Sequence, residues 1–190
     1  MQHTGTKVLT TDRLILRPFR PEDAPAMYNN WACDPEVTKF LTWPPHSSAE
    51  VTASLLTAWV GHYSEPAYYN WAITLKEKDE PIGNISVVEI KDNVSEAVIG
   101  YCMSRSLWRR GIMPEALSAI MDYLFDVGFL RIAAAHDVNN PASGRVMEKA
   151  GMKYEGCLRQ HGRNNQGIVD IVMRAALRDE YMKEKALQNG

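Results

Sequence analysis

Apolar and polar residues alternate along several short stretches of the chain, as they do in half-buried strands. Clusters of turn-forming residues at 78–81 and 91–93 separate three of these stretches from one another. We therefore predict an antiparallel meander in the middle of the chain. Before residue 104, the predicted strands are 13–18, 68–76, 82–90 and 95–103.

Apolar residues recur every three or four positions in other stretches, which predicts helices. One helix begins at residues 21–23, has acidic residues in its first turn and ends near Ala32. A second follows the capping-box pattern of residues 47–50. Its expected buried stripe is Val51, Leu55, Ala58, Trp59 and His62. A third covers 116–127, with Leu117, Ile120, Met121, Leu124 and Phe125 as its stripe.

The second half of the chain adds a parallel element to this sheet. A predicted strand at 131–138 follows the 116–127 helix, and a strand–helix–strand unit implies parallel strands with a right-handed crossover. Asn140 caps a further short helix that ends at Gly151. Strands at 154–160 and 168–175 and a polar helix from Leu177 complete the chain. We expect a mixed sheet with a cleft where the parallel strands separate.

The segment from Trp108 to Ala116 carries the clearest chemistry. It joins a strand to a helix through Arg109, Arg110 and Gly111, with Pro114 in the first helical turn. Free amides and the helix dipole at a helix start attract anions, and arginine side chains add charged donors. The segment favours a phosphate site, although two solvated arginines on an ordinary turn would give the same pattern.

Composition limits the classes of protein that remain. The 190 residues are 45% hydrophobic and carry a formal net charge of −2, which suits one globular domain over 1–190 and shows no basic stripe for nucleic acid. Cys33, Cys102 and Cys157 lack the spacing of metal ligands or of a disulfide framework. We expect no metal, no signal peptide, no membrane span and a cytoplasmic location.

Four segments in order resemble the GCN5-related N-acetyltransferases (GNAT), and within them the RimJ/RimL-type protein N-terminal acetyltransferases. The resemblance covers about residues 11–181. Its segments are the opening strand with Pro21, Glu22 and Asp23; residues 99–116; Asn140 to Ser143 with Glu148 to Met152; and Tyr154 to Arg159 with Asp170.

This resemblance implies an α+β fold, a three-layer α/β sandwich whose mixed, mostly antiparallel sheet splays at an acetyl-CoA site and has helices on both faces. It implies acetyl transfer from acetyl-CoA to an amine without a covalent enzyme intermediate. The pyrophosphate would bind Arg109, Arg110, Gly111, Ile112, Met113 and Pro114. The pantetheine arm would pair with the backbone of Tyr101, Cys102 and Met103, and Asn140 and Ser143 would complete the cofactor site. Met103 or its neighbour is the expected oxyanion donor.

The chain departs from the family pattern at Trp108, Met113 and Met147. The first two changes should alter packing and leave the amides in place. Met147 stands where many members have a tyrosine that protonates the leaving thiolate, and methionine cannot donate a proton. Ser143 is the nearest substitute, as in the RimJ/RimL branch, unless it only caps its own helix.

Several residues are candidates for accepting the proton of the amine. Glu155 matches a residue proposed to act near the amine in this branch, and it could instead be an ion-paired strand residue. Glu89 and His161 are weaker candidates, and His136 fits a core histidine better. Glu115 lies in a helix first turn, where a structural role is expected, and Trp43 is a candidate for lining the acceptor groove.

Three functions remain open from the sequence. The first is acetylation of a protein N-terminus, and the second is the same reaction on an amino acid, polyamine or antibiotic. The third is an acyl-CoA-binding module without turnover, which Met147 keeps open. Whether the protein is a monomer or a homodimer stays undecided.

Overall fold

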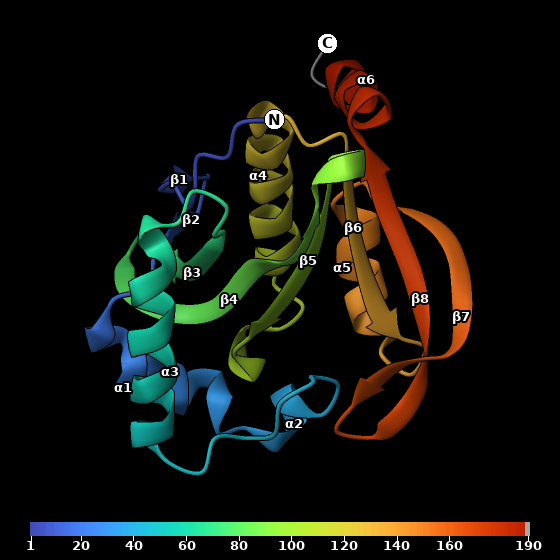
Figure 1. Ribbon diagram of the computed structural model, residues 1–190. Coiled ribbons are helices and arrows are strands. Elements are labelled where there is room, and N and C mark those ends of the chain that lie inside the picture. The colour runs from blue at the N-terminus through green and yellow to red at the C-terminus, as the bar shows by residue number, and fades with distance from the viewer. Residues whose placement is uncertain (189–190) are drawn as a thin grey trace.

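The computed structural model describes residues 1–188, so the last two residues of the predicted 1–190 domain lie outside the described part of the chain. Its strands form one sheet in the order β1-β2-β3-β4-β5-β6-β8-β7 (Figure 1). The strands are β1 (Leu9–Thr10), β2 (Leu14–Arg17), β3 (Asn70–Leu75), β4 (Lys78–Lys91), β5 (Glu96–Met103), β6 (Arg131–Asp137), β7 (Lys153–Asn164) and β8 (Gly167–Leu177). The helices are α1 (Ala24–Met27), α2 (Pro35–Thr38), α3 (Ala49–Gly61), α4 (Ile112–Val127), α5 (Pro141–Lys149) and α6 (Arg178–Gln188).

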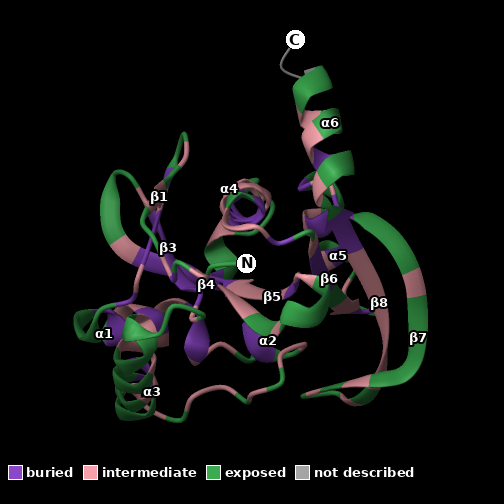
Figure 2. Cartoon of the chain, turned by 45° about the horizontal axis from the view of Figure 1, so that its top comes forward, coloured by how far each residue is buried: buried purple, intermediate pink, exposed green. Residues whose placement is uncertain are grey.

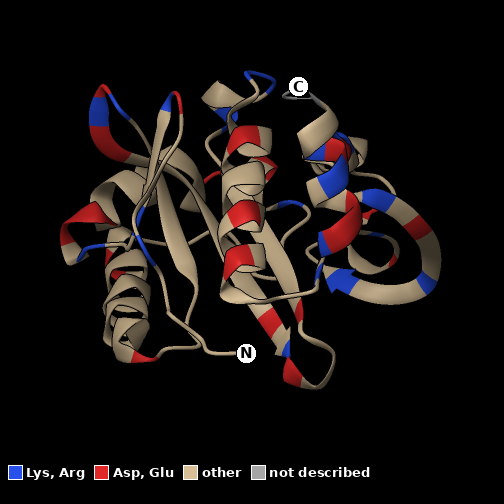
Figure 3. Ribbon diagram, turned by 90° about the horizontal axis from the view of Figure 1, so that it is seen from above, with Lys and Arg blue, Asp and Glu red and all other residues tan. Residues whose placement is uncertain are grey.

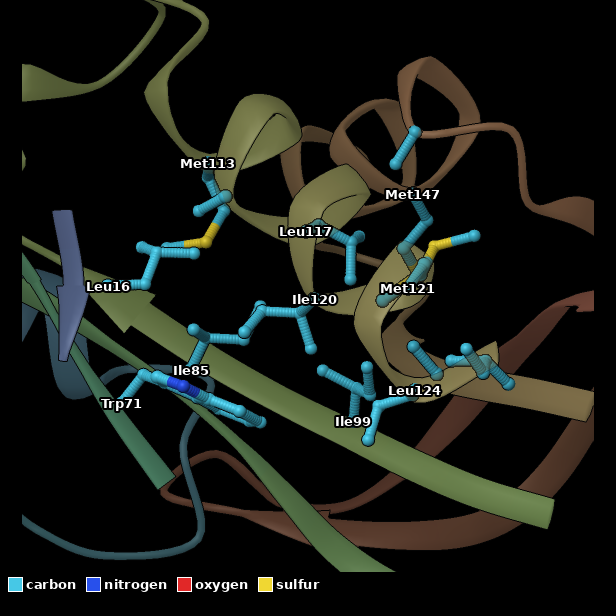
Figure 4. Close-up of a cluster of buried hydrophobic side chains, with 14 of the residues drawn as sticks. Leu16, Trp71, Ile85, Ile99, Met113, Leu117, Ile120, Met121, Leu124 and Met147 are labelled. Atoms are coloured by element: carbon cyan, nitrogen blue, oxygen red, sulfur yellow. The ribbon is translucent and has the colours of Figure 1, made fainter. Parts of the chain in front are cut away.

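Helices cover both faces of the sheet and enclose two hydrophobic cores (Figure 1). The larger core lies between the sheet and α4 and α5, where Leu117, Ile120 and Met121 meet Ile85 and Ile99 (Figure 4). The smaller core lies under α1 and α3, and the outer surface of α3 and most of β7 are exposed (Figure 2). This three-layer arrangement confirms the predicted α+β class.

Helix α4 fixes one wall of the larger core. The predicted stripe from Leu117 to Phe125 is fully buried, because its members recur on the face that packs on the sheet. Gly111 (φ 75°) and Gly128 (φ 115°) bound the helix in left-handed conformations that favour glycine. The helix therefore begins directly at the Arg109–Gly111 turn, one residue after the glycine.

The sheet splits between β5 and β6, which are its parallel pair. Pairing runs from Glu96 opposite Arg131 to Ile99 opposite Ala134. Beyond that point β5 continues to Met103 and β6 to Asp137 without pairing with each other. Every other neighbouring pair is antiparallel. The predicted mixed sheet and its splayed parallel strands are thus confirmed.

Two local predictions are wrong in whole or in part. Residues 78–81 belong to β4 and not to a turn; Pro81 pairs opposite Thr74 beside register shifts, and such an irregularity accommodates a residue without an N–H. The stripe predicted for α3 is only partly right: Leu55 and Trp59 pack against the smaller core, but Val51, Ala58 and His62, which follows the helix, are exposed. The buried residues of α3 are Thr52 and Leu56. Leu56 belongs to the smaller core, and Thr52 can be buried because its hydroxyl forms a hydrogen bond with His46 at 2.7 Å.

The capping pattern of residues 47–50 also behaves differently from the expectation. Ser48 is the N-cap of α3, but its side chain makes no capping hydrogen bond. Among residues 1–188, no helix is long and apolar enough to span a membrane. Lysine and arginine are interspersed with acidic residues in the view of Figure 3, consistent with the small net charge.

Candidate active site

The turn before α4 presents free backbone amides. Arg109 (φ 64°) and Gly111 (φ 75°) are both left-handed, which turns consecutive N–H groups toward the outside of the loop. Within residues 1–188, the amides of residues 109–113 have no protein acceptor, whereas Trp108 N–H donates to the Arg105 carbonyl. A helix start with several free amides and two exposed arginines can hold a phosphate group.

Arg13, the residue just before β2, makes hydrogen bonds to this turn, a role that the sequence did not reveal. Its guanidinium donates to Glu115 Oε2 at 2.7 Å and to the Arg110 carbonyl at 3.0 Å. Glu115 also accepts from the Thr11 hydroxyl at 2.5 Å and from the Arg13 amide at 3.0 Å. Burial raises the pKa of Glu115, but these donors outweigh it and hold the pKa below its usual value. Glu115 is structural, as predicted.

The free edge of β5 lies in the gap between the split strands. Successive residues of a strand direct their backbone groups to opposite sides. Ser104 donates to Ile82 in β4, and the Ser95 carbonyl accepts from Leu130 beside β6. Gly100 and Cys102 therefore face β4, whereas Tyr101 and Met103 direct their backbone groups into the gap.

Trp108 uses one of these edge groups. Its indole N–H donates to the Met103 carbonyl at 3.0 Å, which links the turn of residues 109–111, the candidate anion-binding turn, to the end of β5. The Met103 N–H remains directed into the gap. The Cys102 side chain packs on the smaller core, where burial raises the pKa of its thiol to about 12. A thiol with that pKa stays protonated and unreactive.

Helix α5 begins next to the gap, and Asn140 caps it as predicted. The Asn140 side chain accepts from the Ser143 amide at 3.3 Å, and Pro141 occupies the first turn. Ser143 lies 2.9 Å through its hydroxyl from the Tyr101 hydroxyl. Met147 is buried in the larger core near Met121 (Figure 4). The structure thus brings Tyr101, Asn140 and Ser143 together and keeps Met147 in the core.

Polar contacts link the tip of the β7–β8 hairpin, the loop after α2 and the C-terminal ends of β5 and β6, and we call this set of contacts the rim. Asn165, at the tip of the β7–β8 hairpin, donates through its side chain to the carbonyls of Thr38 (2.8 Å) and Trp43 (2.7 Å), and through its amide to the Leu41 carbonyl. Figure 1 shows this tip beside the loop that follows α2.

Two further contacts complete the rim. Asn164 donates to Asp137, the last residue of β6, at 2.7 Å. Arg105, just beyond β5, pairs with Asp34, the N-cap of α2, at 3.1 Å.

The comparisons with known proteins now decide the family. Residues 13–153 match the model of the acetyltransferase (GNAT) domain, which is more than half of the chain. The chain belongs to the GNAT acetyltransferases. It is an acetyl-CoA-dependent N-acetyltransferase, in agreement with the anion-binding turn and the split sheet described above.

Individual relatives support this assignment. The uncharacterized N-acetyltransferase YoaA of Bacillus subtilis is 34% identical over 155 residues, covering 81% of this chain and 87% of YoaA. The ribosomal-protein-serine acetyltransferase of Escherichia coli is 30% identical over 140 residues, covering 73% and 78% of the two chains. The structure of RimL, a ribosomal L7/L12 alpha-N-protein acetyltransferase in complex with coenzyme A, has a TM-score of 0.80 at 24% identity and covers 90% of this chain and 98% of RimL.

Glu155 of this acetyltransferase is not brought to Ser143. Its carboxylate binds Arg131 at 2.5 and 2.6 Å, and Arg131 also binds Glu96. Arg131 and Glu96 are the first residues of β6 and β5, whereas Ser143 follows the opposite end of β6. The guanidinium of Arg131 is the main reason that the pKa of Glu155 lies below its usual value. The structure therefore shows the ion-paired strand residue that the sequence left open.

Neither of the weaker candidate bases makes a contact with Tyr101 or Ser143 in the described part of the chain. Glu89 is exposed in a bulge of β4, 3.8 Å from Lys91. His161 is exposed where β7 bulges away from β8. A groove of about 620 Å³ borders that bulge, lined by Arg159, Gln160 and Asp170.

His136 precedes α5 in the chain, and one of its two ring nitrogens is engaged. Its Nδ1 donates to the Asp137 carbonyl at 2.8 Å, and its ring packs against Gly144. Among residues 1–188, no group of three or more histidine, cysteine, aspartate or glutamate side chains could hold a metal ion.

Proposed function

We propose that this acetyltransferase acetylates the α-amino group at the N-terminus of a protein. The contacts of the rim are the observation that carries the proposal. Because they tie the β7–β8 hairpin to the loop after α2, we expect the gap to admit a narrow chain end more readily than a side chain on a folded surface. The Escherichia coli relative acts, by its name, on a ribosomal protein, which agrees with this class of acceptor.

The donor would bind on the other side of the gap. The free amides of residues 109–113, with Arg109 and Arg110, suit the pyrophosphate of acetyl-CoA. Pro114 has no N–H to donate to the pyrophosphate, so its role is limited to favouring the first turn of α4. The amide-rich pantetheine arm suits the free edge of β5, where Tyr101 and Met103 offer backbone groups on either side of Cys102.

The chemistry needs a donor for the thioester oxygen and one for the leaving sulfur. The Met103 N–H, directed into the gap, is our candidate for the oxygen, because backbone amides stabilise a developing oxyanion. Ser143, at the start of α5, is our candidate for the sulfur. Asn140 would hold the first turn of α5 in place and can also contact the pantetheine arm.

The acceptor must be neutral to attack. An α-amino group has a pKa of about 7.7–8.0 and a lysine side chain about 10.4, so at neutral pH only the former is neutral in a sizeable fraction. Because the structure does not bring Glu155 to Ser143, an acceptor that loses its proton readily suits this site. This reasoning favours an N-terminal amine over lysine.

The test is acetyl-CoA turnover, followed by thiol release, on three matched panels. The first holds peptides with free N-termini, the second the same peptides N-blocked with an internal lysine, and the third small amines. We expect turnover on the first panel alone. Turnover on small amines alone would move the function to metabolites or antibiotics. Binding of acetyl-CoA without turnover on any panel would favour the non-catalytic module.

A further inference from the structure

The hydroxyl of Tyr101 crosses the gap and meets the start of α5. It lies 2.9 Å from Ser143 Oγ and donates to the Ser143 carbonyl at 3.0 Å. Tyr101 lies on β5 and Ser143 on α5, so this contact joins one strand of the split pair to the helix that begins next to the gap. It also supplies an aromatic hydroxyl to the helix that carries the core residue Met147.

The Tyr101 hydroxyl has two acceptors within reach and one proton to give. When it donates to the Ser143 carbonyl, Ser143 Oγ can donate back to Tyr101. When it donates to Oγ, the Ser143 proton is free to point elsewhere. In the second arrangement Ser143 Oγ accepts a hydrogen bond from Tyr101 while its own O–H can donate to another group. Hydrogen bonds linked in this way strengthen one another.

The surroundings keep the Tyr101 hydroxyl protonated. Burial raises the pKa of Tyr101 well above its usual value, and the nearby positive charge of Arg174 only partly opposes this effect. Gly144 packs against the His136 ring, which fixes the helix turn that carries Ser143. Tyr101 therefore keeps its proton at neutral pH and can donate a hydrogen bond, but it does not act as an acid that releases its proton.

We propose that Tyr101 is a positioning residue that turns the Ser143 hydroxyl toward the leaving sulfur of acetyl-CoA. The proposal rests on the role given to Ser143 above. In the step, the amine nitrogen forms a bond to the acetyl carbon, and the carbon–sulfur bond breaks with its electron pair on sulfur. The Ser143 O–H donates a hydrogen bond to that sulfur while Tyr101 donates to Oγ. The proton that the amine loses to water balances the one that the thiolate takes up from water.

The test compares Tyr101→Phe, Ser143→Ala and the double variant, with Tyr123→Phe as the control. Tyr123 is a matched tyrosine whose hydroxyl binds Gly5 and Thr4, remote from the gap. We expect Tyr101→Phe to lower kcat about tenfold, the upper end of the scale for one hydrogen bond between neutral groups, with KM for acetyl-CoA unchanged within about twofold. The double variant should be no slower than Ser143→Ala.

The outcomes separate this inference from the proposed function. Wild-type kcat in Tyr101→Phe, or losses that multiply in the double variant, would overturn the role of Tyr101 while leaving acetyl transfer intact. Wild-type kcat in Ser143→Ala would overturn both residue roles. If Tyr101→Phe does not fold, difluorotyrosine at position 101 keeps the shape and makes the phenol more acidic. Its kcat should then differ from wild type, and an unchanged kcat would contradict the inference.

Discussion

Arg131 donates two short hydrogen bonds to the Glu155 carboxylate, and its third nitrogen donates to Glu96. The three side chains join β5, β6 and β7 near the N-terminal ends of the parallel pair. A carboxylate held in this way is poorly suited to accept a proton from an amine at the opposite end of the gap. The ion pairs link the three strands, and this is the basis of the first prediction.

We therefore expect Glu155→Gln to change stability more than turnover. Removing one partner of a half-exposed ion pair should lower the free energy of unfolding by about 1 kcal/mol. The kcat should stay within about twofold of wild type, because Glu155 is not brought to Ser143. A twofold change corresponds to only about 0.4 kcal/mol in the activation free energy. Urea denaturation and thiol-release kinetics on one preparation measure both quantities. A hundredfold loss of kcat with unchanged stability would restore Glu155 as the base.

Gly111→Ala should weaken acetyl-CoA binding. Gly111 has φ 75°, and a Cβ there would also approach Arg13 at 3.4 Å. A left-handed alanine costs roughly 1–2 kcal/mol, and the strain would disturb the turn that offers its amides. We expect a raised Kd for acetyl-CoA by calorimetry. Gly61→Ala is the matched control, because its Cβ meets nothing within 4 Å; an equal change in Kd there would refute the argument.

The sequence predicted most elements because their signals are local. The stripe of α4, the Asn140 cap and the strand–helix–strand unit each depend on residues within one turn or one crossover, and all three are confirmed. The stripe of α3 was only partly right, because its buried face depends on the residues around Phe19, Met27 and Trp31, which come from another part of the chain. Pro81 was misplaced because the bulge that accommodates it forms only when β3 pairs with β4.

The same distinction applies to the site. The turn before α4, with its free amides, could be predicted, because a glycine, two arginines and a helix start are adjacent in the sequence. Arg13 was missed because 102 positions separate it from Glu115. The Tyr101–Ser143 contact spans 42 positions, and nothing along the sequence marks it. Glu155 was predicted as catalytic by resemblance, and its ion pair with Arg131 became visible only in the structure.

Gly144→Ala should disturb the start of α5. A Cβ at this position would lie 2.6 Å from His136 Nε2, closer than packed atoms allow. Overpacking of this kind costs typically about 1–3 kcal/mol, so we expect a lower melting temperature and a slower enzyme. Adding His136→Ala should recover part of the stability, because it removes the clashing ring. Simple additivity of the two losses would show that the ring is not the cause.

Stability should fall as the pH decreases through the range in which His46 titrates. Burial lowers the pKa of His46, so the folded protein favours the neutral ring. The stabilisation is present above the unfolded pKa, about 6.5, and is lost as the pH falls through the lower folded pKa. His46→Asn keeps a polar partner for Thr52 and removes the titration. Denaturation between pH 7.5 and pH 5 should show a smaller decline for the variant than for wild type; parallel curves would contradict this assignment.

Asn165 links the tip of the β7–β8 hairpin to the loop after α2, so its side chain should influence which acceptors reach the gap. Asn165→Ala removes two hydrogen bonds, to Thr38 and Trp43, that are worth about 1–3 kcal/mol together. The hairpin tip should then separate from the loop after α2 more often, and bulkier acceptors such as peptides with internal lysines should gain activity relative to free N-termini. Gln166→Ala alters the same turn without removing these bonds and serves as the control. Equal acceptor preferences in Asn165→Ala and wild type would mean that the rim does not select the acceptor, whatever the acceptor is.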